Sequence, residues 1–536
     1  MPVRMVDDQD DQNSSNDDSN SGSSSNSGTG GGGFPGGGSG GGLAALLPLV
    51  LGLFRSKVGI FVLILGAAAY FFLGQKGCSG GGMSETLQKF ATGGKLDANE
   101  FKKAPVYEGL SDDDIKNPLP ESVSLAKFAP PRGNQGHQGS CVAWSSAYGA
   151  RSILQAISTG ESPDQAAFSP AFLYNQIGLD GCQGSYIIRA MEFMQAKGAL
   201  PMSQFPYDEN NCSRAPNSSQ LQAATQYTIH GFNRLTSTED TRGINIRAIK
   251  EHLAKDAPVV IGMMVGGSFM QDMMGRKVWQ PTQDDQQQIG FGGHAMCVIG
   301  YDDRLEGGAV QIMNSWGTEW GENGIGWVRY ADFKNFVREA YGIDPMPKQG
   351  VALNQAFDCE IGLLEKTSKQ YIPLKSSSSN VFASSALPKG TNFKVEVKNT
   401  NECYVYVFGQ ETDGSSYTLF PYPSTTDPTK SAFSPYCGVT GYRVFPHGKM
   451  MQLDAVGNKD YIAVVVSKQE LNWYGLNQAI SKNKTNYITA VSSALVGNGA
   501  SVGRMQVNST GKGNMHFTAP AGDKSVAFAV VELNKQ

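Results

Sequence analysis

Apolar residues are distributed so unevenly along the chain that they divide it into five parts. The first part contains almost no aliphatic side chains and consists mainly of Ser, Asn, Asp and Gly. Such a segment cannot bury enough apolar surface to offset the entropy lost on ordering, so we expect it to be disordered. A strongly apolar part, a polar linker and two regions with the pattern of folded domains follow. The five parts span residues 1–42, 43–74, 75–118, 119–346 and 351–536.

The apolar part contains a run of 17 residues without a charge, 58–74, near the lower limit for a helix that crosses a bilayer. A helix in a protein core rarely carries apolar side chains on all sides, and a cleaved signal peptide would start closer to the N-terminus. The pattern therefore predicts one transmembrane helix within the anchor 43–74. Two positive charges before the run, Arg55 and Lys57, outnumber Lys76 after it. This bias favours a cytoplasmic N-terminus, with the folded regions on the periplasmic or extracellular side.

The fourth part changes from helical to strand-like periodicity along its length. Apolar residues recur with helical spacing in 141–157 and 186–197. Apolar and β-branched runs follow at 259–265, 294–301, 309–316 and 324–330. Helices that precede strands are typical of the α+β fold class, so we expect an α+β domain over 119–346.

The fifth part has the pattern of an all-β domain. Alternating or β-branched and aromatic runs, separated by turn-rich segments, occur at 393–399, 403–410, 417–423, 461–468 and 526–533. A β-sandwich is the architecture that we expect for 351–536.

The charge and the cysteine content narrow the functional classes. The 536 residues carry a formal net charge of −4, which gives no electrostatic basis for binding nucleic acid. The eight cysteines include no CxxC pair and no Cys/His cluster with zinc spacing, so we expect neither a metal nor another cofactor. Disulfide bonds are expected only if the compartment is oxidising.

One cysteine, Cys141 in RGNQGHQGSCVAW, lies at the predicted start of a helix. A free cysteine is often just a small buried side chain, but a helix N-terminus also stabilises a thiolate. A nucleophile needs a base, and His294 in FGGHAMCVIGY starts a strand after two glycines that allow close approach. Asn314 in NSWGTEWGEN can accept a hydrogen bond from the imidazole and orient it. Gln135, six residues before the cysteine, can donate to a developing oxyanion.

Together, these motifs resemble the papain family of cysteine peptidases. QGSC, GHAMCVIGY and NSWGTEWGENG occur in the family's order, and 153 residues separate Cys141 from His294, close to the ~130–150 typical of the family. LPESVSL (119–125) is similar to the start of the mature domain, GCQGSY (181–186) to the family's Gly-Cys-Asn-Gly-Gly segment, and FPYDENNC (205–212) to its Tyr-Pro-Tyr segment. The resemblance covers 119–346, under half of the chain.

The resemblance implies a domain of two lobes, one helical and one β, with the active site between them. Cys141 would be the nucleophile, a thiolate paired with His294. Asn314 would orient the imidazole, and Trp316 would shield their hydrogen bond from water. Gln135 would complete the oxyanion hole.

The resemblance also implies where a substrate binds. The peptide would lie along Gly184 and Ser185. Gly262 and Gly293 would flank a roomy pocket, without a fixed charge, for the second residue before the scissile bond. The family commonly carries a long inhibitory propeptide, and residues 83–118 are too few for the usual one.

Several positions depart from the family's pattern. Gln138 stands where the family has a cysteine, and Val142 stands where it has a tryptophan. Cys182 and Cys212 are each left without the usual partner, so the resemblance implies a rewired Cys182–Cys212 disulfide. We therefore identify a divergent, bacterial-type member of the family.

The β region resembles an uncharacterised bacterial β-sandwich domain that is appended to envelope and peptidase proteins. The stretch LPKGTNFKVEVKNTNECYVYVFGQETDGSSYTLFPYP carries this resemblance. Such a domain would serve as a scaffold or bind an envelope protein or ligand. Cys403 and Cys437 could pair across two of its strands, although spacing alone does not show it.

The expected function is that of a membrane-anchored, single-pass cysteine endopeptidase of the bacterial cell envelope. It would hydrolyse protein or peptide substrates through a Cys-His-Asn triad and a covalent thioester. Two alternatives stay open from the sequence. One is an inactive adhesion or scaffolding protein with a peptidase fold, and the other is a transpeptidase-like enzyme that transfers acyl groups.

Overall fold

The computed structural model describes residues 3–7, 91–236, 243–348, 356–484, 486–522 and 525–536. The expected membrane helix and most of the expected disordered tail lie outside these residues. Residues 3–7 of that tail form the strand β1, so the prediction of disorder was wrong for them. Within the described ranges, no helix is long and apolar enough to cross a membrane.

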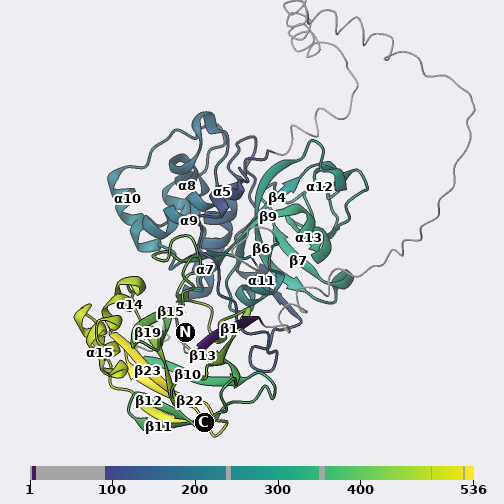
Figure 1. Ribbon diagram of the computed structural model, residues 1–536. Coiled ribbons are helices and arrows are strands. Elements are labelled where there is room, and N and C mark those ends of the chain that lie inside the picture. The colour runs from purple at the N-terminus through teal and green to yellow at the C-terminus, as the bar shows by residue number, and fades with distance from the viewer. Residues whose placement is uncertain (1–2, 8–90, 237–242, 349–355, 485, 523–524) are drawn as a thin grey trace, which may run out of the picture. The chain divides into compact units, whose positions relative to one another are not determined.

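The helical lobe of the first folded region is built around one continuous helix that begins at Cys141. Its first turn is α6 (Cys141–Ala143), its middle is a π-helical stretch (Trp144–Arg151) and its end is α7 (Ser152–Thr159). π-helical turns of this kind are frequent at functional sites. Both helices predicted for this region are present. The other helices of the lobe are α8 (Pro170–Ile177), α9 (Ile187–Ala196) and α10 (Ser218–Ala224) (Figure 1).

The β lobe is one sheet with the strand order β3-β9-β4-β6-β7-β8-β5, in which β2 also pairs with β6. β4 (Val259–Val265) and β6 (Gly292–Asp302) pair antiparallel at its centre. The helical lobe packs on one face of these strands and α11 on the other, so they are apolar on both faces. The remaining strands are β2 (Ser122–Ser124), β3 (Phe232–Arg234), β5 (Val278–Trp279), β7 (Ala309–Met313), β8 (Ile325–Arg329) and β9 (Val337–Ile343). The helices are α11 (Ile246–Leu253), α12 (Gly267–Gln271) and α13 (Tyr330–Phe336).

The C-terminal region consists of two sheets that share one hydrophobic core. Each of the five predicted strands is present. The first sheet contains β1 (Val3–Asp7), β18 (Lys449–Leu453), β13 (Asn392–Asn399), β10 (Ala356–Glu365), β22 (Met515–Pro520), β21 (Gln506–Ser509) and β17 (Gly441–Phe445). The second contains β11 (Leu374–Ser378), β12 (Val381–Ser384), β23 (Ser525–Asn534), β19 (Lys459–Ser467), β14 (Cys403–Gln410), β15 (Ser416–Phe420), β16 (Tyr436–Cys437) and β20 (Ser501–Val502).

The prediction that this region is entirely β was wrong, because it contains two helices. α14 (Trp473–Ser481) and α15 (Tyr487–Gly497) start at the N-caps Asn472 and Asn486. Their apolar faces form a second core with residues of the second sheet. In β14, Val405 and Val407 face the core between the sheets, whereas Tyr406 and Phe408 face the helices. A strand that is buried on both faces needs a cover on each, and here the helices supply the second one.

The short strand β1 bears on the expected membrane topology. It pairs antiparallel with β18, from Val3 opposite Leu453 to Asp7 opposite Lys449. A single membrane crossing between β1 and residue 91 would place these two strands on opposite sides of the bilayer. A chain in which β1 pairs with its own β18 therefore cannot cross the membrane once between β1 and residue 91.

Candidate active site

Cys141 is the first residue of the long helix, and its side chain is fully buried. α6 packs against β6, and the backbone N–H of Ala295 on β6 donates a hydrogen bond to the Sγ atom of Cys141 over 3.4 Å. The two lobes therefore meet at this sulfur. The positive end of the helix dipole lies on one side of it, which favours a thiolate.

His294, directly before Ala295, is also fully buried. Its Nε2 lies 2.8 Å from Oδ1 of Asn314, and this oxygen also accepts the backbone N–H of Ser315 at 2.8 Å. Because Oδ1 is an acceptor, Nε2 carries the proton, and Nδ1 is the free basic nitrogen. Nδ1 has no hydrogen-bond partner among the described residues. The Trp316 indole stacks on the imidazole, with ring centroids 4.3 Å apart, and covers this pair.

Gln135 is held in place from three sides. Its backbone N–H donates to the carbonyl oxygen of Ser315 at 2.8 Å, and its Oε1 accepts the Ser315 hydroxyl at 2.6 Å. Its Nε2 donates one hydrogen bond to the carbonyl oxygen of Gln138 at 2.9 Å. An amide nitrogen has two protons, so one N–H of this fully buried side chain remains for an oxyanion.

The positions that depart from the family's pattern are compensated locally. Cys182 and Cys212 form a disulfide bond with their Cα atoms 6.1 Å apart. Gln138, in place of the family's cysteine, accepts the Tyr207 hydroxyl at 3.2 Å and donates to the carbonyl oxygen of Glu209 at 3.3 Å. Its amide thereby joins the turn before Cys141 to residues 207–209 through polar contacts.

A segment that precedes the domain lies across this site. We call residues 91–101 the strap; its end is the short helix α5 (Ala98–Phe101). The Trp316 indole N–H donates to the carbonyl oxygen of Ala91 at 2.9 Å. Ser185 donates its N–H to the carbonyl oxygen of Gly93 and accepts the N–H of Lys95, each at 2.9 Å. The strap therefore occupies the backbone groups at Ser185 that were expected to bind substrate.

Glycines leave room for the strap to pass. A Cβ atom on Gly93 would lie 2.1 Å from the carbonyl oxygen of Gly139, and one on Gly184 would lie 2.1 Å from the carbonyl oxygen of Gly93. On the opposite wall, a Cβ on Gly293 would lie 2.2 Å from the carbonyl oxygen of Gly94. Only a backbone without side chains fits here, and the strap supplies the pair Gly93 and Gly94.

Beyond the glycines, the strap places Leu96 in the pocket expected for a substrate side chain. A Cβ on Gly262 would lie 2.4 Å from Cδ2 of Leu96 and 3.4 Å from Cβ of Glu339, so all three meet there. The Glu339 carboxylate accepts the backbone N–H of Asp97 at 2.9 Å and the Tyr341 hydroxyl at 3.3 Å. The expectation was a pocket without a fixed charge. A glutamate that the motifs did not indicate lies beside the pocket, and burial raises the pKa of its carboxyl to about 7.

Burial sets the protonation of the two groups at the site. Burial raises the pKa of the Cys141 thiol to about 11, against the smaller lowering effect of nearby backbone N–H groups that include that of Gly93. Burial lowers the pKa of His294 to about 4, against the hydrogen bond with Asn314. A thiol and a neutral imidazole are therefore the stable forms while the strap is in place. This state has the catalytic groups in position but does not contain the ion pair.

The expected pairing of Cys403 with Cys437 is absent. The two residues lie opposite one another in β14 and β16, but both are free thiols. The Cys403 thiol has a hydrogen bond with Cys359, and Cys437 Sγ lies 3.7 Å from the carbonyl oxygen of Pro435. Each sulfur is thus directed to a different partner.

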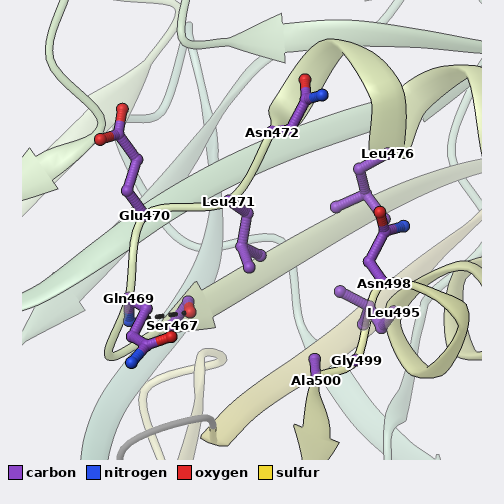
Figure 2. Close-up of a pocket in the computed structure, with 10 residues that line it drawn as sticks. All are labelled: Ser467, Gln469, Glu470, Leu471, Asn472, Leu476, Leu495, Asn498, Gly499 and Ala500. Carbon is purple, nitrogen blue, oxygen red and sulfur yellow. Dashed lines mark hydrogen bonds between the residues drawn. The ribbon is translucent and has the colours of Figure 1, made fainter.

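A pocket of about 300 Å³ lies in the C-terminal region at the ends of α14 and α15. Figure 2 shows Leu471, Leu476 and Leu495 among the lining residues, while the side chain of Glu470 points away from them. Glu470 is the one acidic or basic side chain of its lining, so this pocket lacks the pair of titratable groups that acid–base catalysis usually needs.

These features define a cysteine peptidase domain of the papain type. Residues 119–348 match the model of the papain family cysteine proteases. They form a papain-family cysteine protease domain, followed by a β-rich region.

Among curated proteins, the uncharacterised peptidase C1-like protein L477 of Acanthamoeba polyphaga mimivirus is 28% identical over 239 residues, which cover 43% of this chain and 71% of that protein. Cysteine proteinase 3 of Entamoeba histolytica is 25% identical over 209 residues, 38% of this chain and 61% of that protein. Mouse cathepsin K is 26% identical over 231 residues, 41% of this chain and 65% of that protein. The chain thus spans about three fifths to seven tenths of these relatives. Among solved structures, xylellain, a cysteine protease from Xylella fastidiosa, aligns with 48% of this chain and 97% of its own at 24% identity and a TM-score of 0.40.

Proposed function

We propose that this protein is a cysteine endopeptidase that is held in a latent form by its own strap. The observation that carries the proposal is the arrangement of Cys141, His294 and Asn314. The sulfur lies at a helix N-terminus beside the start of β6, and the asparagine fixes the histidine tautomer that leaves Nδ1 basic.

The chemistry follows from this arrangement once the strap leaves. With water admitted, the desolvation that keeps both groups neutral is relieved, and the proton moves from Cys141 to His294. The thiolate attacks the peptide carbonyl carbon, and Gln135 with the Cys141 backbone N–H stabilises the oxyanion. His294 gives its proton to the leaving amine, a thioester remains, and water activated by His294 hydrolyses it to acid and thiol.

The pocket at Gly262 suggests the substrate class. Removal of Leu96 and Asp97 would open the pocket and withdraw one of the two hydrogen bonds to Glu339. A lysine or arginine side chain has an apolar stem for the pocket and a charge for the carboxylate. The proposed substrates are proteins or peptides with a basic residue two positions before the scissile bond.

The cellular location also belongs to the proposal. The apolar run 58–74 favours attachment to a bacterial envelope membrane, and the pairing of β1 with β18 argues against a single crossing. Protease protection of an N-terminal tag and of a C-terminal tag in intact cells separates the cases. Protection of one tag alone indicates a single crossing, and equal accessibility of both indicates that the two ends share a side.

The test of the activity uses the variant Leu96→Asp, in which a carboxylate beside Glu339 repels the strap. We expect this variant to be alkylated at Cys141 by an epoxide inhibitor and to hydrolyse peptide amides, whereas Leu96→Asp with Cys141→Ala does neither. Alkylation without hydrolysis would favour the scaffolding alternative. Transfer of the acyl group to an added amine, in place of hydrolysis, would favour the transpeptidase alternative.

A further inference from the structure

The strap continues into a stretch that is held between the peptidase domain and the C-terminal region. We call residues 104–117 the connector. Its residue Val106 donates its N–H to the carbonyl oxygen of Ala432 at 2.7 Å and accepts the N–H of Ser434 at 3.1 Å. On its other side, Arg234 of β3 donates its N–H to the carbonyl oxygen of Pro105 at 2.8 Å. Val106 thus forms β-bridges on both sides, with Arg234 of the peptidase domain and with Phe433 of the C-terminal region.

Further contacts to the C-terminal region follow along the connector. The Arg443 guanidinium on β17 donates from Nε to the carbonyl oxygen of Glu108 at 3.0 Å. Ser111 donates its N–H to the carbonyl oxygen of Tyr442 at 2.8 Å. The Asn117 side chain makes two hydrogen bonds with the backbone of Tyr442, at 2.9 and 3.0 Å. These bonds follow the backbone of β17, so the connector is joined to the first sheet over most of its length.

Besides Arg234, a buried carboxylate of the peptidase domain also holds the same stretch. Glu251 on α11 accepts the Tyr107 hydroxyl at 3.1 Å and the N–H of Leu110 at 3.2 Å. Val106, Tyr107 and Leu110 are all at least nine-tenths buried. The connector therefore cannot be displaced while the C-terminal region stays in place.

Lys102 and Lys103 are the two residues that separate the strap from the connector. The turn between them is closed by a hydrogen bond from the N–H of Ala104 to the carbonyl oxygen of Phe101 at 3.1 Å. The Phe101 ring is fully buried against Tyr341 on β9, with centroids 5.0 Å apart. The connector therefore fixes the end of the strap at Phe101. A strap that leaves the active site must pivot about that end.

We infer that the C-terminal region acts as an intramolecular clamp, which keeps the peptidase latent by holding the connector and thereby the strap. This function deepens the proposed peptidase activity and rests on it. It gives the appended β-rich region a task that needs no catalytic residue. It also implies that a cut within the exposed turn 112–115 of the connector does not activate the enzyme, because the strap stays attached without a covalent link.

A pocket that is open to solvent interrupts the interface that forms the clamp. A cavity of about 500 Å³ lies between the connector, α11 and the C-terminal loops. Met5 of β1 reaches this cavity, together with Glu108, Glu251, Tyr422 and Phe433. Because part of the interface lines this open pocket, separating the two domains there loses fewer contacts than opening a filled core would.

The first test removes one backbone bond of the clamp in the full-length chain. Ser434→Pro deletes the N–H that Val106 accepts, whereas the matched control Ser434→Ala keeps it. We expect Ser434→Pro to raise the rate of Cys141 alkylation by iodoacetamide at least tenfold, measured on the Cys141 peptide by mass spectrometry. Ser434→Ala should stay within twofold of the wild type. If Leu96→Asp is alkylated rapidly but Ser434→Pro reacts as slowly as the wild type, the clamp is refuted although the strap is upheld.

The second test cuts the chain, so it does not depend on how well the proline variant folds. The turn 112–115 is exposed, with 94% of Ile115 accessible to solvent, and takes a recognition site for a specific protease. After complete cutting, we expect Cys141 to stay as unreactive as in the intact chain. A reactive Cys141 after cutting alone would overturn the inference. Alkylation of Cys141 measures whether the strap has left the site, and peptide hydrolysis measures catalysis. If Ser434→Pro makes Cys141 reactive but the protein hydrolyses no peptide, the proposed activity is contradicted and the clamp is upheld.

Discussion

The strap and the connector are adjacent stretches of one segment, yet different kinds of contact hold them. The strap passes between glycines, and most of its bonds join backbone to backbone around Gly93 and Gly94. The connector combines a backbone ladder at Val106 with bonds from buried side chains, among them Arg443 and Glu251.

This difference shows where each function resides. A channel of glycines accepts any backbone without large side chains, so it suits an occupant that must be exchanged for substrate. Buried side chains with specific partners suit a fixed joint. The exchangeable strap thus lies over the sulfur of Cys141, and the more firmly held connector lies between the two domains.

The largest expected effect comes from one methyl group in the channel. Gly93→Ala would bring a Cβ to 2.1 Å from the carbonyl oxygen of Gly139, and backbone there cannot give way. We expect the strap to leave the groove and the rate of Cys141 alkylation to rise ~100-fold or more. The control Lys95→Ala changes an exposed neighbour and should leave the rate as it is. Equal rates in the two variants would mean that the channel does not select for glycine.

The next effect concerns the oxyanion donor, with the strap displaced by Leu96→Asp. Gln135→Ala removes the fixed amide, and we expect kcat to fall by ~10²–10³-fold with little change in KM, because the bond forms mainly in the transition state. His137→Ala, an exposed change two residues away, serves as the control. Steady-state kinetics on a peptide amide measure both. A rise in KM at constant kcat would assign Gln135 to substrate binding instead.

A smaller effect is expected at Glu339. In the same background, Glu339→Gln should lower kcat/KM by about 10–100-fold for substrates with arginine two residues before the scissile bond, since a charge-assisted bond contributes about 1.5–3 kcal/mol. Substrates with leucine at that position should be cleaved by both forms at similar rates. A library in which only this position varies measures the ratio. An unchanged arginine preference would place the charge of Glu339 outside the substrate's reach.

The catalytic set could be predicted from the sequence because its chemistry leaves compact motifs. Cys141, His294, Asn314 and Gln135 each lie within a short stretch that fixes a local turn or strand end, and the structure brings the four stretches together. Glu339 left no such motif. It is one carboxylate in the otherwise apolar strand VREAYGI, and its neighbours Leu96 and Gly262 are remote in sequence.

The position of the strap could not be predicted for a different reason. Its residues Thr92, Gly93 and Gly94 read as a flexible linker, and their fit depends on glycines brought together from three other segments. The five C-terminal strands that were predicted are present, because β-branched alternation is a local signal, whereas the other strands of the two sheets were not predicted. The helices α14 and α15 were missed, although Asn472 and Asn486 provide N-cap signals for them.

The smallest effect is a pH dependence of the free energy of unfolding that arises from Glu108 in the connector. Burial raises the pKa of Glu108 to about 7, against the lowering influence of His447, Arg443, Tyr422 and Lys394 around it. A carboxyl whose pKa is higher in the folded state stabilises the fold below its unfolded pKa of 4.5, and this stability is lost as the pH rises towards 7. Glu108→Gln removes the titration and should leave stability nearly unchanged at pH 4.5. By pH 8 it should be more stable than the wild type by on the order of 2–3 kcal/mol. Thermal unfolding at the two pH values measures the difference, and Glu121→Gln on the exposed surface is the control. A difference that stays constant between the two pH values would show that Glu108 is charged in the joint, and that its charge contributes to holding the connector.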